Sequence, residues 1–475
     1  MDVNDASLRR PHVVVVPYPS QGHINPLLQF AKRLASKGIK ATLATTKYTF
    51  SSISALKNVS VEPISDGFDE FGFSQAGSEE IFLNSFKLNG SKSLAQIIEN
   101  HKNASFPVTC VIYDAFLPWA LDVAKEYGLY GAAFFTNSAT VCSIFACVDR
   151  GLISLPMVEP DEVVNALTKM PKFKANDLPS FLKKPESYPA YLAMKLSQFS
   201  NLGLADWAFC NSFEDLELEV IQGVPGWPAK LIGPMVPSSY LDGGIEGDIG
   251  YGASLWKPLS EQCKEWLQTK PKKSIVYISF GSMVSLTQEQ MEELAWGLKE
   301  SNYNFLWVIR ESQHNKLPKE FQEEIAKGKM GMIVTWCNQL EVLAHEAIAC
   351  FVTHCGWNST LEGISLGVPM VGVPQWSDQL PDAKFIEEVW EVGVRAKEDK
   401  TGVVRREEFK CCLKEVMEGK RSAEIREKSV KWRELATKAV SKGGSSDNHI
   451  QGFVEHLEHA INAKANQNQG LLQTN

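Results

Sequence analysis

Two residues in the first quarter of the chain have side chains suited to acid–base chemistry. His23 ends the loop after the apolar run Val13–Val16, and Asp114 follows a second apolar run, Val108–Tyr113. Open α/β sheets bind ligands at the carboxyl ends of their strands. A carboxylate hydrogen-bonded to one imidazole nitrogen fixes the tautomer of the ring and stabilises the imidazolium. The pair is thus a candidate general base with its orienting acid, but each residue alone has a plainer interpretation, as a solvated loop histidine and a strand-end cap.

The stretch from Trp336 to Gln379 holds the densest set of residues that could bind a charged ligand. Its apolar pattern predicts strands at 332–335, 350–353 and 370–373 and helices at 339–345 and after the turn 354–359. Gly367 is placed to end the second helix. The start of that helix, at Asn358 and Ser359, offers free N–H groups and the positive end of the dipole, which suits a phosphate.

Residues in this stretch also have plainer interpretations. Trp336 could be a core aromatic at a strand end, and His354 a hydrogen-bonded core histidine. Ser359 and Glu362 have the spacing of a capping box, in which Glu362 would only cap its own helix. The last two residues of the stretch could form an ordinary polar loop. The local pattern leaves these alternatives open.

The elements that must position these residues have the order of a doubly wound α/β protein. Further buried strand patterns occur at 13–16, 41–45, 108–113, 132–136, 208–211, 230–232, 275–279 and 305–309. We expect Asn25 to cap the first helix, with Pro26 at its first position and Gly38 at its end. The loop before this helix contains one glycine, Gly22, and no GxGxxG motif, which disfavours a dinucleotide dehydrogenase.

A chain of 475 residues exceeds a single core and should divide into about two domains. We expect an N-terminal domain over 1–242, a glycine-rich linker over 243–257, a C-terminal domain over 258–449, and a final helix with a polar tail over 450–475. The helix is predicted at Ile450–Ile461 and disorder after Ala463. The irregular segment 170–204 is typical of a segment that shapes a variable pocket.

Composition restricts the possible partners. A net charge of −8 without a basic patch argues against nucleic acid. No apolar run approaches the length of about 18 residues that spans a membrane, and the N-terminus has no apolar signal core. Ten cysteines without a CxxC pair indicate reduced, buried thiols. We therefore expect a cytoplasmic monomer without a nucleic-acid or membrane partner.

The 336–379 stretch resembles the signature box of plant family 1 UDP-glycosyltransferases. The matching positions are Trp336, Gln339, Val342, Leu343, His345, Phe351, His354–Ser359, Glu362, Gly367–Pro369, Pro374, Asp378 and Gln379. So many residue types at fixed spacing make the resemblance specific, and it extends over nearly the whole chain. Three positions depart from the family pattern: Asn338 replaces a proline, Ala349 a glycine and Asp382 an asparagine. We expect Ala349 to alter a turn before the strand.

The resemblance implies a GT-B fold, an α/β architecture in which two Rossmann-like doubly wound domains face a cleft and the last helix crosses back to the first domain. It implies that His23 is the general base and Asp114 its partner. Uracil would stack on Trp336, and Glu362 would bind the ribose hydroxyls. The implied UDP-binding residues are Ser282, Trp336, Cys337, Gln339, His354, Gly356, Asn358, Ser359 and Glu362. The implied sugar-binding residues are Thr136, Trp357, Asp378 and Gln379.

The activity implied by the resemblance is inverting transfer of glucose from UDP-glucose to a hydroxyl or carboxyl of an apolar plant metabolite, giving a β-glucoside. The chain contains no Asp-x-Asp, so we expect no metal. We expect a steroid or terpenoid acceptor in a pocket lined by Tyr18, Phe116, Phe135, Met194 and Trp376. The alternatives are a flavonoid, phenolic or aromatic-acid acceptor, a donor such as UDP-galactose or UDP-glucuronate, and a nucleotide-sugar binding protein without turnover.

Overall fold

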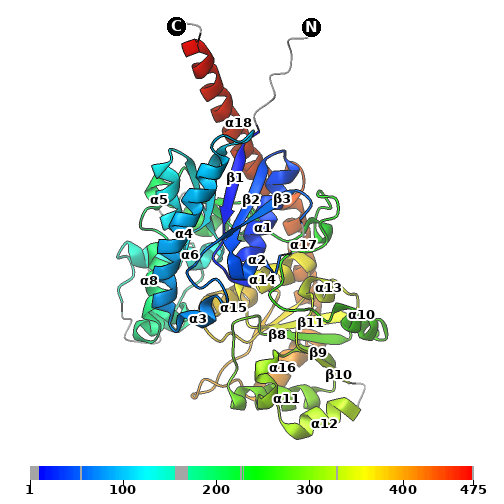
Figure 1. Cartoon of the computed structure of the whole chain (residues 1–475). Helices are drawn as coiled ribbons and strands as arrows, with labels where there is room; N and C mark the ends of the chain where they lie inside the picture. The colour runs from blue at the N-terminus through cyan, green and yellow to red at the C-terminus, as the bar shows by residue number, and fades with distance from the viewer. Residues whose placement is uncertain are drawn as a thin grey trace.

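Runs of β-branched and apolar residues form the strands of two parallel sheets. The computed structural model describes residues 10–53, 56–155, 169–224, 227, 229–327 and 330–472. The first sheet has seven strands in the order β3-β2-β1-β4-β5-β6-β7, and the second has six in the order β10-β9-β8-β11-β12-β13. In each sheet the strand order reverses beside the first strand of that half, which is where doubly wound sheets bind ligands. The predicted α/β class and GT-B fold are confirmed, with the two sheets in separate lobes (Figure 1).

The strands of the first sheet are β1 (His12–Val16), β2 (Lys40–Thr46), β3 (Val59–Ile64), β4 (Val108–Asp114), β5 (Tyr130–Phe135), β6 (Trp207–Cys210) and β7 (Lys230–Leu231). Those of the second sheet are β8 (Ile275–Ser279), β9 (Asn304–Val308), β10 (Gly331–Val334), β11 (Ile348–Thr353), β12 (Met370–Gly372) and β13 (Gly393–Arg395). The predicted strands therefore agree with the structure to within about two residues at each end.

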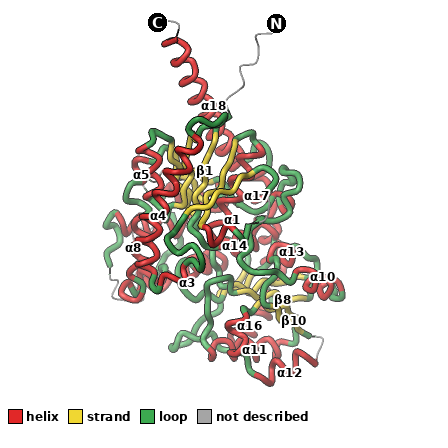
Figure 2. The backbone as a smooth tube through the Cα atoms, in the orientation of Figure 1, coloured by secondary structure: helices red, strands yellow, loops and turns green. Residues whose placement is uncertain are grey.

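The helices surround the strands, as the tube in Figure 2 shows. In the first half they are α1 (Gln21–Ser36), α2 (Lys47–Phe50), α3 (Phe73–Ala76), α4 (Glu79–His101), α5 (Trp119–Glu126), α6 (Ala139–Asp149), α7 (Ser180–Lys183), α8 (Pro189–Ser197) and α9 (Glu214–Gln222). In the second they are α10 (Ser260–Gln268), α11 (Gln288–Ser301), α12 (Lys319–Lys327), α13 (Gln339–Leu343), α14 (Trp357–Leu366), α15 (Gln379–Glu388), α16 (Arg406–Glu418), α17 (Ser422–Val440) and α18 (Ser445–Leu472). Successive strand residues alternate between faces, so Val13 and Val15 pack on α1 and α18, and Val14 and Val16 on the opposite core.

The start of α1 differs from the prediction. Ser20, not Asn25, is the N-cap residue, so His23 lies in the first turn of α1 rather than in a loop. Pro26 lies inside the helix and has no N–H, which leaves the carbonyl of Gly22 without its usual intrahelical donor. That carbonyl instead accepts the side-chain amide of Asn358 from the second half, at 2.5 Å. Pro26 thereby exposes a hydrogen-bond acceptor at the junction of the two halves.

The last helix, α18, crosses back from the second half to the first sheet (Figure 1). Ile450, Phe453, Val454 and Leu457 are buried in the same core as β1 and α1, and the Phe453 and Phe209 rings lie 5.1 Å apart. The helix is longer than the predicted 450–461 because it begins at Ser445 and continues to Leu472. The prediction of disorder after Ala463 is therefore wrong up to residue 472. Residues 473–475 and the N-terminal residues 1–9 lie outside the described chain.

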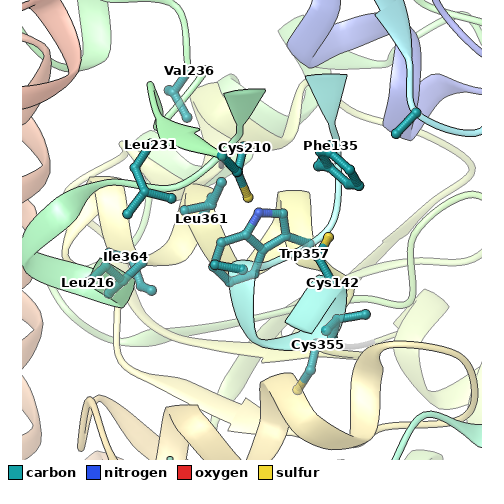
Figure 3. Packing of buried hydrophobic residues seen from close by; sticks show 14 of the residues in the cluster. Phe135, Cys142, Cys210, Leu216, Leu231, Val236, Cys355, Trp357, Leu361 and Ile364 are labelled. Carbon is teal, nitrogen blue, oxygen red and sulfur yellow. The ribbon is translucent and has the colours of Figure 1, made fainter. Parts of the chain in front are cut away.

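The two halves also share an apolar interface around Trp357. Its indole is 3% exposed and belongs to one core with Phe135, Cys210 and Leu361, as Figure 3 shows. The indole N–H donates to the backbone carbonyl of Asn211 in the first half at 2.7 Å. A side chain of the second half is therefore part of the core of the first. In the described part of the chain, no helix is long and apolar enough to cross a membrane.

Candidate active site

A cavity of about 470 Å³ lies between the two halves. Its walls come from the segments that follow β1, β4 and β5 of the first sheet and β8, β10, β11 and β12 of the second. All predicted UDP-binding and sugar-binding residues line it, as does His23, while Asp114 lies behind His23. The carboxyl ends of two parallel sheets thus face one space, as expected for ligand sites in such sheets.

His23 and Asp114 form a hydrogen-bonded pair at the wall of this cavity. His23 Nδ1 lies 2.6 Å from Asp114 Oδ2 and 3.1 Å from the hydroxyl of Thr136. Asp114 is fully buried, and its carboxylate also accepts the backbone N–H groups of Tyr18 and Phe116, at 3.3 and 3.1 Å. Because a carboxylate only accepts hydrogen bonds, the proton belongs on Nδ1. Nε2 of His23 is then free to accept a proton.

Aromatic side chains surround this pair on the acceptor side. The rings of Tyr18 and Phe116 lie 5.3 and 4.9 Å from the His23 ring, and Met194 and Trp376 also line the cavity. The prediction that Phe135 lines the pocket is wrong. Phe135 is 1% exposed, absent from the cavity wall and packed on Phe199 and Trp227, because the pleat of β5 turns it into the core.

The N-terminus of α14 faces the middle of the cavity. Gly356 is its N-cap, and the first intrahelical bond runs from the N–H of Thr360 to Gly356, so the preceding N–H groups have no helical acceptor. His354 lies beside them, and burial lowers its pKa to about 4, so that its imidazole is neutral at pH 7. Ser282 lines the wall nearby. These groups can stabilise a diphosphate without a basic side chain in contact.

Two glycines make room for the His354 ring. A Cβ atom on Gly281 would lie 2.8 Å from the ring, and one on Gly356 would lie 2.5 Å from its Nε2. Gly281 also has a φ of +68°, which side chains disfavour. Both positions therefore require glycine. His354 Nδ1 has no hydrogen-bond partner among the described residues.

A polar network occupies the end of the cavity near Trp336. Gln339 donates to Ser359 at 2.9 Å and to Glu362 at 2.7 Å. Glu362 is buried, which raises its pKa to about 7, and it also accepts the hydroxyl of Tyr251 at 2.9 Å. The capping-box interpretation is wrong, because Gly356 and not Ser359 is the N-cap of this helix. Glu362 instead belongs to a polar network with Gln339 and Tyr251 in the cavity wall.

Trp336 and Cys337 form the floor beside this network. The Trp336 ring packs on Trp256 with 4.6 Å between centroids, at 38°. The Cys337 thiol is buried against the Tyr277 hydroxyl at 3.4 Å. A hydrogen bond with the Cys263 thiol, together with burial, raises the pKa of Cys337 well above its usual value, so Cys337 is a neutral thiol.

Asp378 and Gln379 lie at the start of α15 and line the cavity. Because α15 follows β12 and α14 follows the neighbouring strand β11, the two helix starts lie side by side at one edge of the second sheet. The carboxylate of Asp378 accepts the amide of Asn137 at 3.0 Å. Gln379 Oε1 accepts the backbone N–H groups of Gln375 and Trp376, at 2.9 and 3.1 Å. Gln379 therefore holds its own loop and keeps its NH₂ group for a ligand. The indole N–H of Trp357, also predicted to bind sugar, is already bonded across the interface and is not available to a hydroxyl.

Sequence reasoning missed several residues that line the cavity, among them the polar residues Asn137, Tyr251 and Lys195. Asn137 follows β5 and Tyr251 lies in the segment predicted as a linker, and neither has a pattern that marks it. Lys195 lies in α8, within the segment predicted to be irregular. A lysine between apolar residues in that segment was a weak signal that could have been used.

The three departures from the family pattern have different surroundings. Asn338 is the N-cap of α13 and lines the cavity, although its side chain makes no capping bond. Ala349 lies within β11, at an irregularity in its pairing with β8, and not in a turn before the strand. Asp382 is 1% exposed and accepts the Ser138 hydroxyl at 2.8 Å. Burial raises the pKa of Asp382 well above its usual range. Among the residues that the structure describes, no group of three His, Cys, Asp or Glu side chains is placed to hold a metal ion.

Comparison with known proteins identifies the family of the chain. Residues 210–428 match the family described as UDP-glucoronosyl and UDP-glucosyl transferase, and residues 11–59 match the N-terminal domain of glycosyltransferases. The chain is 52% identical to UDP-glycosyltransferase 74B1 of Arabidopsis thaliana, over 94% of this chain and 97% of that protein. It is 46% identical to flavonol 7-O-beta-glucosyltransferase UGT74F1 of the same plant, over 94% and 99%.

The crystal structure of Os79 from O. sativa in complex with UDP has the same architecture. The two chains superpose with a TM-score of 0.89 at 37% identity, over 94% of this chain and 100% of Os79. The sequence relatives, the shared fold and the cavity built from both sheets lead to one assignment. The chain belongs to the plant UDP-glycosyltransferase family and is a UDP-glycosyltransferase.

Proposed function

We propose that this enzyme transfers glucose from UDP-glucose to a hydroxyl of an apolar plant metabolite with inversion at the anomeric carbon. The observation that carries the proposal is the His23–Asp114 pair, bonded at 2.6 Å, in the wall of the cavity that the N-terminus of α14 also lines. His23 supplies a base for the acceptor, and the N-terminus of α14 supplies N–H groups for the leaving diphosphate.

In the proposed step, the acceptor hydroxyl gives its proton to Nε2 of His23 while its oxygen attacks the anomeric carbon. The bond from that carbon to the diphosphate breaks, and UDP leaves with the electron pair. The Asp114 carboxylate stabilises the imidazolium that forms. His354 and the first N–H groups of α14 stabilise the charge on the diphosphate. The step needs no enzyme nucleophile, and we propose that it needs no metal.

The proposed donor preference rests on Gln379 and Asp378. Glucose and galactose differ only in the direction of one hydroxyl, so a polar group must distinguish them. The NH₂ group of Gln379 is available for this because its Oε1 is already bonded to the backbone of Gln375 and Trp376. Asp378, which only accepts hydrogen bonds, would bind hydroxyls that both sugars share.

The acceptor that we propose is a steroid or terpenoid. Tyr18, Phe116, Met194 and Trp376 give the acceptor side an apolar wall, which suits a large aglycone with few polar groups. Flavonoids, other phenols and aromatic acids are the second class, favoured by the flavonol named for UGT74F1. The cytoplasmic location and monomeric state remain predictions of the sequence.

An acceptor panel tests the proposal. The purified enzyme would be incubated with UDP-glucose and sterols, triterpenoids, flavonoids or aromatic acids, and UDP release and glucoside mass would be measured for each. We expect a β-glucoside with at least one sterol or triterpenoid. Glucosylation of flavonoids alone would refute the acceptor class, and UDP binding without transfer to any acceptor would refute glucosyl transfer.

A further inference from the structure

Lys195 is a buried lysine in the wall of the cavity. It lies in α8 and is 5% exposed, with its Nζ 4.4 Å from the centroid of the Phe116 ring. Lysines are almost never this buried unless they are paired, yet Lys195 forms no ion pair with a described carboxylate. The one hydrogen bond of its Nζ to a described residue is to the side-chain carbonyl of Asn137, at 2.8 Å. The role of this buried lysine is therefore to be sought in its bond to Asn137.

Asn137 connects Lys195 to the second half of the enzyme. Its Oδ1 accepts from Lys195, and its Nδ2 donates to Oδ2 of Asp378 at 3.0 Å. An ammonium group only donates and a carboxylate only accepts, so these two neighbours together allow one orientation of the amide. If Lys195 were absent, Asp378 alone would hold the amide in this orientation, and the oxygen of the amide would lose its donor.

Asp378 is the residue that this arrangement affects. Of the charged groups around Lys195, which also include Asp114 and Asp382, Asp378 has the largest favourable interaction with the ammonium. Two other contacts hold the loop of Asp378 and the start of α15 to the first half. The N–H of Ser377 donates to the hydroxyl of Ser180 at 2.7 Å, and Ser138 donates to Asp382 at 2.8 Å. These contacts fix the loop, whereas the amide of Asn137 fixes the carboxylate itself.

We infer that Lys195 is a positioning residue for the sugar of the donor, which acts through Asn137 to hold one oxygen of Asp378 and leave the other for glucose hydroxyls. The inference deepens the proposed function and rests on Asp378 contacting the sugar. We expect the UDP part of the donor to bind at Trp336 and the first N–H groups of α14. Among the described residues, the Nζ of Lys195 bonds to Asn137 and not to these groups, so UDP binding should not depend on Lys195.

The test separates binding of the sugar from binding of the nucleotide. Lys195→Met keeps the apolar stem and removes the charge and donors, and the dissociation constants of UDP-glucose and UDP would be measured by calorimetry without an acceptor. We expect UDP-glucose binding to weaken by about tenfold, the order of one charge-assisted hydrogen bond, with UDP binding unchanged. Lys184→Met, which removes an exposed lysine from the neighbouring segment, is the control and should change neither constant.

A double-mutant cycle tests whether Lys195 acts through Asn137 and Asp378. In an Asp378→Ala background, Lys195→Met should have no further effect, and Asn137→Leu should reproduce the effect of Lys195→Met. Equal weakening of UDP and UDP-glucose, or an undiminished effect in the Asp378→Ala background, would overturn the inference. If Lys195→Met does not fold, Lys195→Gln is used under the same criteria. Absence of glucose transfer by the unmodified enzyme would instead refute the proposed function, so the two failures are distinguishable.

Discussion

Replacing Asp114 by asparagine removes one negative charge from the His23 pair and changes little in shape. Asp114 accepts three hydrogen bonds, from His23 and from the backbone N–H groups of Tyr18 and Phe116. If the asparagine oxygen keeps the bond to Phe116, its NH₂ group faces both His23 Nδ1 and the N–H of Tyr18. Nδ1 must then act as acceptor, which moves the imidazole proton to Nε2. Nε2, which should take the proton of the substrate hydroxyl, would then already carry a proton.

The expected loss combines this tautomer change with the loss of a charge that stabilises the imidazolium. General-base catalysis is worth about 10²–10⁴-fold, and we expect Asp114→Asn to lower kcat by a factor within that range. Donor binding should change little, because Asp114 does not line the cavity. The assay is steady-state turnover with calorimetric UDP binding, and the melting temperature serves as the folding control. A kcat within about threefold of the unmodified enzyme, with intact folding, would refute the role of Asp114 in orienting His23.

Three further predictions concern the donor side. Burial raises the pKa of Glu362 to about 7, so the carboxylate that would accept ribose hydroxyls forms only as the pH rises through 7. UDP-glucose should therefore bind about tenfold more tightly at pH 8 than at pH 6, as measured by calorimetry. In Glu362→Gln the dissociation constant should not depend on pH in this range. A dissociation constant that is independent of pH in the unmodified enzyme would contradict the role of Glu362 in binding the ribose. Gln379→His should shift the ratio of kcat/KM toward UDP-galactose, whereas Asp378→Ala should weaken both donors together; an unchanged ratio in Gln379→His would show that this residue does not read the sugar. Activity should survive EDTA, and a complete loss that manganese or magnesium restores would falsify the metal-free step.

Most of the fold could be predicted because runs such as Val13–Val16 are seldom found outside buried strands. A continuous β-branched run is buried on both faces in a parallel sheet, and β1 has this environment. Helix starts were harder to predict. Asn25 and Pro26 form a good local start signal, yet α1 begins earlier, at Gln21. The carbonyl of Gly22, which Pro26 leaves free, accepts from Asn358 of the other half, a contact that the local sequence does not indicate.

The site was predictable where a fixed motif contained its residues, and not where it depends on the fold. The stretch 336–379 brings together His354, Glu362 and Asp378 because it spans three successive strand ends. Lys195 and Tyr251 reach the same cavity from α8 and from the segment predicted as a linker, and no periodicity marks them. Phe135 was misplaced because successive residues of a strand face opposite sides of the sheet, so an error of one residue exchanges the core side and the cavity side.

The most direct test of general-base catalysis is the turnover of His23→Ala with a hydroxyl acceptor and with a thiol analogue of the same acceptor. The variant keeps Asp114 and the whole donor side, so its affinity for UDP should match that of the unmodified enzyme. We predict a loss of at least about 10²-fold with the hydroxyl acceptor and a much smaller loss with the thiol, which is already partly ionised near its pKa of about 8.5. Retention of more than about a tenth of the turnover with the hydroxyl acceptor would contradict general-base catalysis by His23.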